Sequence, residues 1–324
     1  MTMLRVLISR LGQAALVMLA VSAVSFAMFR FVGDPVATLS RENATVEEKA
    51  ALRASLGLER PILVQYGDFL GRIVRGDLGI SFRNQRPVGE LIAERLPATL
   101  ELVIVATILS LALGIPLGVL CALKPDGVAA RLVQAVSLIG ISTPTFVTGI
   151  VLILVFAVSL GLLPSFGRGE TVKIGFWTTG FLRLSGLKAL ILPGITLALY
   201  QLTLIMRLVR SELIDVLSSD YIRFARARGL SARHIHFKLA LRNALMPVIT
   251  VTGLQIGSLI AFAIVTETVF QWPGLGLLFI QAVSFSDVPV MAAYLLFVGL
   301  LFVIINTVVD LLYAVVDPRL RVRA

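Results

Sequence analysis

The two histidines of the chain, His234 and His236, are the first residues to test for chemistry, because imidazole binds metals and transfers protons. They lie two positions apart, so on a helix they point in different directions, and no third ligand lies nearby in the sequence. We therefore expect them to pack in a loop or an interface and to hold no metal. The single cysteine, Cys121, excludes an intrachain disulfide and a cysteine metal cluster.

Motifs for hydrolytic chemistry are missing from the sequence. A phosphate-binding loop for ATP hydrolysis reads Gly-x4-Gly-Lys-Ser/Thr, and the chain contains no Gly-Lys dipeptide. The Gly-x-Ser-x-Gly elbow of acyl-transfer enzymes does not occur either. A protease that works inside a membrane needs paired aspartates, and only Asp310 lies clearly within an apolar run. We therefore predict that the chain is not an enzyme and binds no cofactor or metal of its own.

Four strongly polar residues lie in or near long apolar runs: Glu101, Glu267, Asn306 and Asp310. Such groups are costly in lipid and are often functional. They also lie near the ends of the runs, where water or an arginine can satisfy them. We favour structural roles, with Asp310 paired to a C-terminal arginine.

The composition requires a membrane. Hydrophobic residues make up 57% of the chain, charged residues only 15%, and the mean hydropathy is +0.94. Crossing a hydrocarbon core of about 30 Å takes about 20 apolar residues, and runs near that length recur. The first run is too long for a cleaved signal peptide and is better explained as a retained span. The sequence therefore predicts an all-α integral membrane protein with about six spans: Leu11 to Phe29, Thr99 to Leu123, Leu132 to Leu160, Leu190 to Met206, Leu245 to Thr266 and Val290 to Val316.

Proline and glycine predict details of these spans. The third span contains Pro144 within a run of Ser and Thr, so we expect a bend or break there. The pair Gly253 and Gly257 has the small-xxx-small spacing that lets helices approach closely, and we expect a neighbouring helix against it. The pair Gly114 and Gly118 has the same spacing, but Pro116 between the two glycines is expected to compromise it.

Basic residues in the short loops predict that both termini lie in the cytoplasm. In this orientation the inner segments hold fifteen Lys or Arg, and the short outer loops hold four. The inner excess of basic over acidic residues equals the net charge of the whole chain, +10. Membrane orientation and contact with anionic lipid therefore explain the basic charge, and we expect no nucleic-acid partner.

The predicted organisation has three parts. Residues 1–31 form the N-terminal transmembrane helix, residues 32–97 an ordered extracytoplasmic segment, and residues 98–324 a core of five transmembrane helices. The extracytoplasmic segment contains a helix-like patch from Thr45 to Leu56. The core contains a long cytoplasmic loop, residues 207–244, between its third and fourth helices, which are the fourth and fifth of the chain.

That loop contains a basic stretch, Tyr221 to Pro247, without a single acid. Ser218, Ser219 and Asp220 before it predict a helix start, since short polar side chains cap free N–H groups and an acid suits the positive end of the helix dipole. Gly229 predicts the stop, because glycine adopts the left-handed conformation that closes a helix. The helix is therefore expected over Tyr221 to Arg228. Ser231 is expected to cap a second helix running toward Arg242, with Pro247 in the first turn of the next span.

On the first of these helices, Tyr221, Phe224, Ala225 and Arg228 fall at i, i+3, i+4 and i+7 and share one face. Two explanations fit this face. The helix could lie on anionic lipid with its arginines reaching the head groups, or it could enter a groove on a partner protein.

The stretch Asp220 to Leu230, followed by Arg242 to Pro247, resembles the cytoplasmic coupling motif of permease subunits in ATP-binding-cassette importers. In the dipeptide, oligopeptide, nickel and glutathione group, this motif reads roughly Asp-Tyr-aliphatic-Arg-x-Ala-Arg-Ala-Lys-Gly-Leu, then Arg-Asn-Ala-x-x-Pro. Here Arg228 replaces the lysine, and Phe224 occupies the variable position. Further segments resemble the group in the same order along the chain: Val32 to Pro35, Leu56 to Pro61, Gly76 to Ser81, Arg95 to Leu102, Gly114 to Gly118, Val269 to Gly276 and Asp317 to Arg319.

The resemblance implies the first permease subunit of an importer that moves dipeptides, oligopeptides or a related small solute across the inner membrane of a prokaryote. It implies a second homologous permease, two ATPase subunits that bind ATP and Mg²⁺, and an extracytoplasmic solute-binding protein. Because members of the group carry peptides, glutathione or nickel, the cargo stays open. The alternative is a secondary transporter or channel driven by an ion gradient, but such a protein would have no use for the coupling motif. By the resemblance, the residues that contact the ATPase are Asp220, Tyr221, Arg223, Phe224, Ala225, Arg226, Ala227, Arg228, Gly229 and Leu230.

Overall fold

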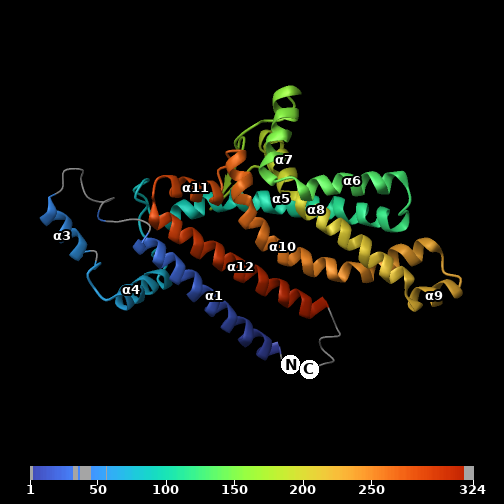
Figure 1. The fold of residues 1–324 in the computed structure, drawn as a ribbon, viewed down its shortest axis with the longest axis horizontal. Coiled ribbons are helices and arrows are strands. Elements are labelled where there is room, and N and C mark those ends of the chain that lie inside the picture. Colours follow the sequence, from blue (N-terminus) through green and yellow to red (C-terminus); the bar gives the residue numbers. More distant parts are fainter. Residues whose placement is uncertain (1–2, 32–35, 37–44, 56, 317–324) are drawn as a thin grey trace.

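The computed structural model describes residues 3–31, 36, 45–55 and 57–316. Within them the chain is mostly helical, and its named strands form one small antiparallel hairpin (Figure 1). The elements are α1 (Met3–Phe31), α3 (Val46–Ser55), α4 (Ile62–Val74), α5 (Val88–Leu123), α6 (Val128–Ser142), α7 (Thr145–Leu152), the π-helix η1 (Ile153–Ser159), β1 (Val172–Ile174), β2 (Trp177–Thr179), α8 (Leu184–Ser218), α9 (Asp220–Ala227), the π-helix η2 (His234–Ala240), α10 (Leu241–Val269), α11 (Leu275–Ser284) and α12 (Val288–Val316).

Four helical segments are long and apolar enough to cross a membrane: Val88–Leu123, Leu184–Ser218, His234–Val269 and Val288–Val309. The pair formed by α6 and α7 with η1 would be a fifth span, although its two parts are bent by 112°. In α1 the apolar segment Gly12–Met28 is shorter. The chain is therefore a multi-pass membrane protein, and the count of six spans stays a prediction.

The bend between α6 and α7 confirms the prediction made from Pro144. This proline precedes α7 as its N-cap residue, where its missing N–H leaves no helical hydrogen bond unmade. The third predicted span, Leu132 to Leu160, is thus two helices at a steep angle and not one straight crossing.

The most extensive helix packing among the described residues joins α5 and α8, and it runs through the two glycines that Pro116 was expected to compromise. A Cβ atom added to Gly118 would lie 2.7 Å from the carbonyl oxygen of Met206, and one added to Gly114 would lie 3.0 Å from Ile205. The expectation was wrong because α5 continues through Pro116 without a break, so both glycines keep the same face.

The second glycine pair packs as predicted. A Cβ atom added to Gly253 would lie 2.5 Å from Val309, and one added to Gly257 would lie 2.7 Å from Phe302. The side chains of α12 therefore occupy the space left by the glycines of α10.

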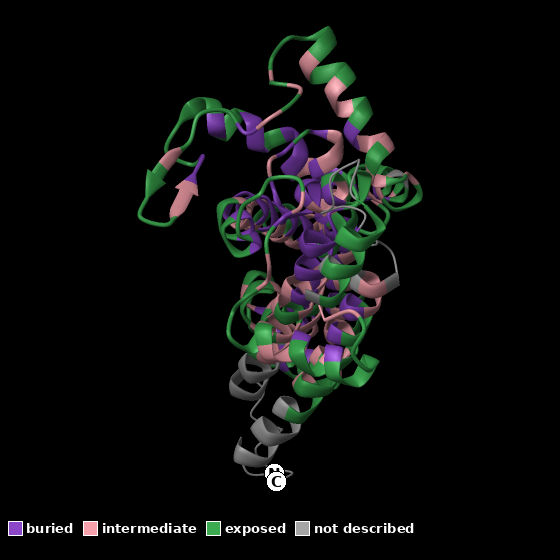
Figure 2. Cartoon of the chain, turned by 90° about the vertical axis from the view of Figure 1, so that its left-hand side faces the viewer, coloured by how far each residue is buried: buried purple, intermediate pink, exposed green. Residues whose placement is uncertain are grey.

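Buried residues are concentrated in the middle of the bundle, and exposed residues cover its outer helix surfaces (Figure 2). The central core is built from α5, α8 and α10, with Leu102, Leu197 and Ile260 among its members. Many large apolar side chains on the outer surfaces are exposed, as expected for helices that face lipid.

The segment after α1 contains α3 and α4. The helix-like patch expected from Thr45 is α3, where Thr45 and Glu48 exchange hydrogen bonds of 2.9 and 3.2 Å in a capping box. Helix α4 was not predicted. The expected boundary at residue 97 falls inside α5, because the polar first turns of that helix continue directly into its apolar part.

Candidate functional site

Helix α9 lies at one end of the bundle, between the long helices α8 and α10 and far from α3, α4 and α11 (Figure 1). It starts where Ser219 takes an extended conformation, with φ −70° and ψ 154°. The Ser219 hydroxyl does not cap α9 as predicted, because it donates back to the Val216 carbonyl of α8 at 2.6 Å. Backbone bonds from Ile222 and Arg223 to the Ser219 carbonyl, both 3.1 Å, begin the helix instead.

The end of α9 confirms the role of Gly229. Its φ is +74°, and its N–H donates to the Arg226 carbonyl at 2.9 Å. The N–H of Leu230 donates to the Ala225 carbonyl at 3.4 Å, which completes the closure expected of a left-handed glycine. Helix α9 therefore covers Asp220–Ala227, one residue earlier than predicted.

The predicted face of α9 is divided between solvent and the protein interior. Tyr221 and Phe224 are 51% and 64% exposed. Ala225 is only 5% exposed, so its side chain belongs to the interior and not to the exposed face with Phe224. The interior side of α9 also contains Ile222, which is fully buried and was not among the predicted site residues. The signal for it was its spacing of three from Ala225.

The remaining predicted residues are exposed. Arg223 and Asp220 form an exposed ion pair at 3.0 Å, and the guanidinium of Arg228 lies 5.8 Å from the ring centre of Phe224. We call the exposed side of this region the α9 surface; its residues are Asp220, Tyr221, Arg223, Phe224, Arg226, Ala227, Arg228, Gly229 and Leu230.

The buried side of α9 fixes the helix to the bundle. Ile222 and Ala225 belong to one apolar cluster with Leu213 of α8, Ile235 of η2 and Ala244 of α10. All five side chains are at most 5% exposed. A force applied to the α9 surface therefore reaches two long helices through packed side chains.

The chain after Gly229 agrees with the prediction in part. Ser231 caps the next helix, because its Oγ accepts the His234 N–H at 3.4 Å. That helix does not end near Arg242 but continues through the π-helix η2 into α10, so Pro247 lies inside a helix and not in a first turn. His234 lies in η2, and the described part of the chain contains no group of three or more residues able to hold a metal.

A second constellation lies at the opposite end of the bundle, where Glu101 of α5 is fully buried. Its carboxylate accepts from Arg168 at 2.6 Å, from the Gly180 N–H at 3.3 Å and from Trp177 Nε1 at 3.4 Å. Arg168 also donates to the Thr178 carbonyl at 2.6 Å. An arginine thus satisfies Glu101, as the structural explanation expected, although Arg168 itself was not predicted.

Glu267 is also fully buried, and it caps helix α11. Its carboxylate accepts from the N–H groups of Gly276 and Leu277 at 2.7 and 3.0 Å, which are free donors at a helix N-terminus. It also accepts from the Thr99 hydroxyl at 2.6 Å, while that hydroxyl accepts from the Leu275 N–H at 2.8 Å. Sequence reasoning placed Glu267 at a helix end but missed Thr99.

A third buried acid, Asp287, was not predicted. It accepts from the Ser81 hydroxyl at 2.5 Å and from the Phe82 N–H at 3.0 Å. The sequence offered one indication of this site: the segment Gly76 to Ser81 resembles the importer family, and its last residue forms the contact with Asp287.

The Asn306 side chain has a buried Oδ1 without a partner among the described residues, and the predicted pairing of Asp310 lies outside the described side chains.

Comparison with known proteins identifies the family. The model described as "binding-protein-dependent transport system inner membrane component" matches residues 114–322, and the model of its N-terminal part matches residues 3–103. The dipeptide transport system permease protein DppB of Escherichia coli (strain K12) is 38% identical, covering 98% of this chain and 99% of that protein. DppB of Alkalihalophilus pseudofirmus is 39% identical, covering 94% and 96%.

A solved structure of the MetNI methionine ABC transporter, in an inward-facing conformation, shares the fold. Its TM-score is 0.56 at 21% identity, over 70% of this chain and 96% of that chain. The family models, the full-length relatives and the apolar helices agree. The chain belongs to the binding-protein-dependent transport system inner membrane components, the multi-pass permease subunits of ATP-binding-cassette peptide importers.

Proposed function

We propose that the chain is one of two permease subunits in an importer that moves dipeptides or oligopeptides across the cytoplasmic membrane. The observation that carries this proposal is the identity of 38% to a dipeptide permease over 98% of the chain. The complex would also contain a second homologous permease, two ATPase subunits and an extracytoplasmic binding protein. ATP and Mg²⁺ would be bound by the ATPase subunits.

Both termini and the α9 surface are proposed to face the cytoplasm. The support is the concentration of Lys and Arg in the segments that this orientation places inside. In a background with Cys121 replaced by Ser, we expect Arg226→Cys to react with an impermeant maleimide only after permeabilisation. The hairpin variant Phe176→Cys, whose native side chain is 90% exposed, should react in intact cells. Labelling of Arg226→Cys in intact cells would contradict the orientation.

The α9 surface is proposed to dock on an ATPase subunit. Its two exposed aromatic residues, Tyr221 and Phe224, are suited to a groove on a partner, because aromatic anchors dominate protein interfaces. The guanidinium of Arg228 near Phe224 adds a charge at the edge of this patch. Closure of the ATPase dimer on ATP would then carry α9, and with it α8 and α10.

The test uses the reconstituted importer with all its subunits. We expect Phe224→Ala to lower ATP-driven peptide uptake about tenfold or more, the loss typical of one aromatic anchor. The matched control is Phe237→Ala in η2, whose native side chain is 54% exposed in the same loop and lies outside the α9 surface. Wild-type uptake by Phe224→Ala with normal subunit assembly would contradict docking.

The same preparation tests the alternative of a secondary transporter. Vesicles that contain the permease subunits without the ATPase are expected to take up no dipeptide under an imposed proton or sodium gradient. Uptake there would exclude the importer mechanism. Competition among dipeptides, tripeptides and glutathione in the complete system would define the cargo.

A further inference from the structure

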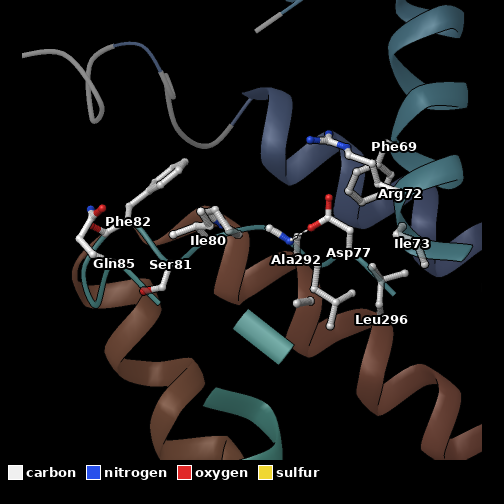
Figure 3. A pocket seen from close by; sticks show the side chains of 14 residues that line it. Phe69, Arg72, Ile73, Asp77, Ile80, Ser81, Phe82, Gln85, Ala292 and Leu296 are labelled. Carbon is white, nitrogen blue, oxygen red and sulfur yellow. Dashed lines mark hydrogen bonds between the residues drawn. The ribbon is translucent and has the colours of Figure 1, made fainter. Parts of the chain in front are cut away.

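A groove of about 420 Å³ lies between α4, the segment 77–85 and the first turns of α12 (Figure 3). Its walls are mainly apolar and include Phe69 and Ile73 of α4, Ile80 and Phe82 of the loop, and Leu296 of α12. The volume and lining suit a flexible hydrocarbon chain. No part of the proposed coupling mechanism uses this groove.

Two opposite charges, Arg72 and Asp77, lie together on one side of the groove (Figure 3). The end of α4 holds them there: Gly76 has a φ of +78°, its N–H donates to the Ile73 carbonyl at 2.9 Å, and the Asp77 N–H donates to the Arg72 carbonyl at 3.0 Å. The Asp77 carboxylate accepts from the Gly79 N–H at 3.0 Å, which fixes its direction. Within the described residues, neither side chain has an ion-pair partner.

The position of the groove relative to the membrane is inferred from the contacts of α4 with the C-terminal half of α1. The Tyr66 hydroxyl lies 2.8 Å from the Ser22 hydroxyl and donates to the Leu19 carbonyl at 3.3 Å. Leu63 and Val74 of α4 are nonetheless 84% and 86% exposed. An amphipathic helix that packs on a membrane helix while exposing large apolar side chains is typical of the interface between acyl chains and head groups.

We propose that this groove binds one phospholipid with a zwitterionic head group. The guanidinium of Arg72 would donate to the phosphate, the carboxylate of Asp77 would accept from the ammonium, and an acyl chain would fill the apolar groove. An anionic lipid without an ammonium would leave Asp77 beside a negative charge. A short peptide also carries both charges, but the apolar walls and the exposed apolar residues of α4 favour a lipid.

The test measures lipid retained by the purified full-length chain. The protein is equilibrated in nanodiscs that contain equimolar phosphatidylethanolamine and phosphatidylglycerol and is then extracted into mild detergent. Native mass spectrometry identifies the lipid that stays bound. We expect one phosphatidylethanolamine to stay bound. Arg72→Gln should weaken its retention about tenfold, the loss expected for one charge-assisted hydrogen bond. Ile80→Asn, at a wall position that is 59% exposed, should do the same by placing a polar group in the groove.

Two matched controls keep the test specific. Arg75→Gln removes a charge from the same turn without lining the groove, and Ile62→Asn places an amide on α4 at a position 56% exposed and outside the groove. Both should retain the lipid as wild type does. Equal loss in the controls, equal retention of phosphatidylglycerol, or release of the lipid by excess dialanine would each overturn the proposal, the last by making the groove a peptide site.

Discussion

The carboxylate of Glu101 and the guanidinium of Arg168 meet at 2.6 Å, with side chains 0% and 7% exposed, at the end of the bundle opposite α9. The pair joins α5 to the hairpin of β1 and β2 through bonds to Trp177 and Thr178. Both tryptophans of the chain, Trp177 and Trp272, lie beside it, and the ring centre of Trp272 is 5.9 Å from the guanidinium. Tryptophan fluorescence is therefore a local probe of this site.

We predict that removing one partner of this pair is more harmful than removing both. Glu101→Leu or Arg168→Leu alone should lower the free energy of unfolding by about 3–5 kcal/mol, because an unpaired charge stays buried. The double variant should lose less than either single variant, because no unpaired charge then stays buried. Thermal unfolding in detergent, followed by tryptophan emission, checks this. Additive losses would show that the two charges are not coupled.

A second prediction concerns the cap of α11. Thr99→Val removes a hydroxyl that donates to Glu267 and accepts from Leu275, so two buried groups lose a partner. We expect the free energy of unfolding to fall by about 1–3 kcal/mol and amide exchange to become faster at the start of α11. The control is Thr107→Val, whose hydroxyl bonds only the Val103 carbonyl of its own helix. Similar amide exchange in both variants would contradict a specific role of Thr99.

The contact between α5 and α8 gives a third prediction. Gly118→Ala places a methyl group 2.7 Å from the Met206 carbonyl oxygen, so the two helices must separate. We expect this to lower the free energy of unfolding by about 1–3 kcal/mol. Gly71→Ala in α4 is the control, since nothing lies within 4 Å of the added methyl group. It should be neutral or slightly stabilising, because alanine has the higher helix propensity. Thermal unfolding of the two variants under the same conditions distinguishes the cases.

The left-handed conformation of Gly229 gives a fourth prediction. Nothing lies within 4 Å of a Cβ atom added there, so the cost of a side chain comes from the backbone alone. Gly229→Val should strain the turn by about 1–2 kcal/mol and change the direction of α9. We expect this variant to insert into the membrane normally but to hydrolyse ATP without coupled uptake. Gly229→Asn should retain coupling, because asparagine tolerates this conformation. Equal uptake by both variants would argue against a defined α9 orientation.

The buried side of α9 gives a fifth prediction. Ala225→Glu would place a charge inside the cluster that holds α9 on α8 and α10, so we expect impaired folding or assembly and not a clean loss of docking. Ala227→Glu on the α9 surface should assemble normally and lose uptake. The yield of assembled complex and the uptake per complex separate the two effects. Normal assembly of Ala225→Glu would contradict the packing described for that residue.

Local features of the fold were predictable from residue chemistry. The bend at Pro144 and the stop at Gly229 follow from backbone constraints that no distant contact overrides. The packing at Gly253 follows from the absence of a side chain. The same reasoning failed at Pro116, because α8 packs against α5 on both sides of this proline, at Gly114 and at Gly118, and the local sequence does not contain that contact.

The tertiary contacts of the sites were less predictable. Glu101 and Glu267 were visible as costly acids at helix ends, but their partners are distant in sequence: Arg168 is 67 positions away and Thr99 is 168. Ala225 matched the spacing of the exposed face, yet the packing of α9 against η2 turned it inward. Such outcomes depend on where a helix lies in the bundle, and periodicity alone does not determine this.

The unbroken helical path through η2 and α10 has a mechanical consequence. Its 36 residues, His234–Val269, extend about 54 Å, with Ile235 beside α9 near one end and Glu267 at the cap of α11 near the other. A body of this length acts as a lever, so a tilt of about 5° at one end moves the other by about 5 Å. A displacement of α9 would therefore also displace the cap of α11 at the other end of this path, without a relay of side-chain rearrangements.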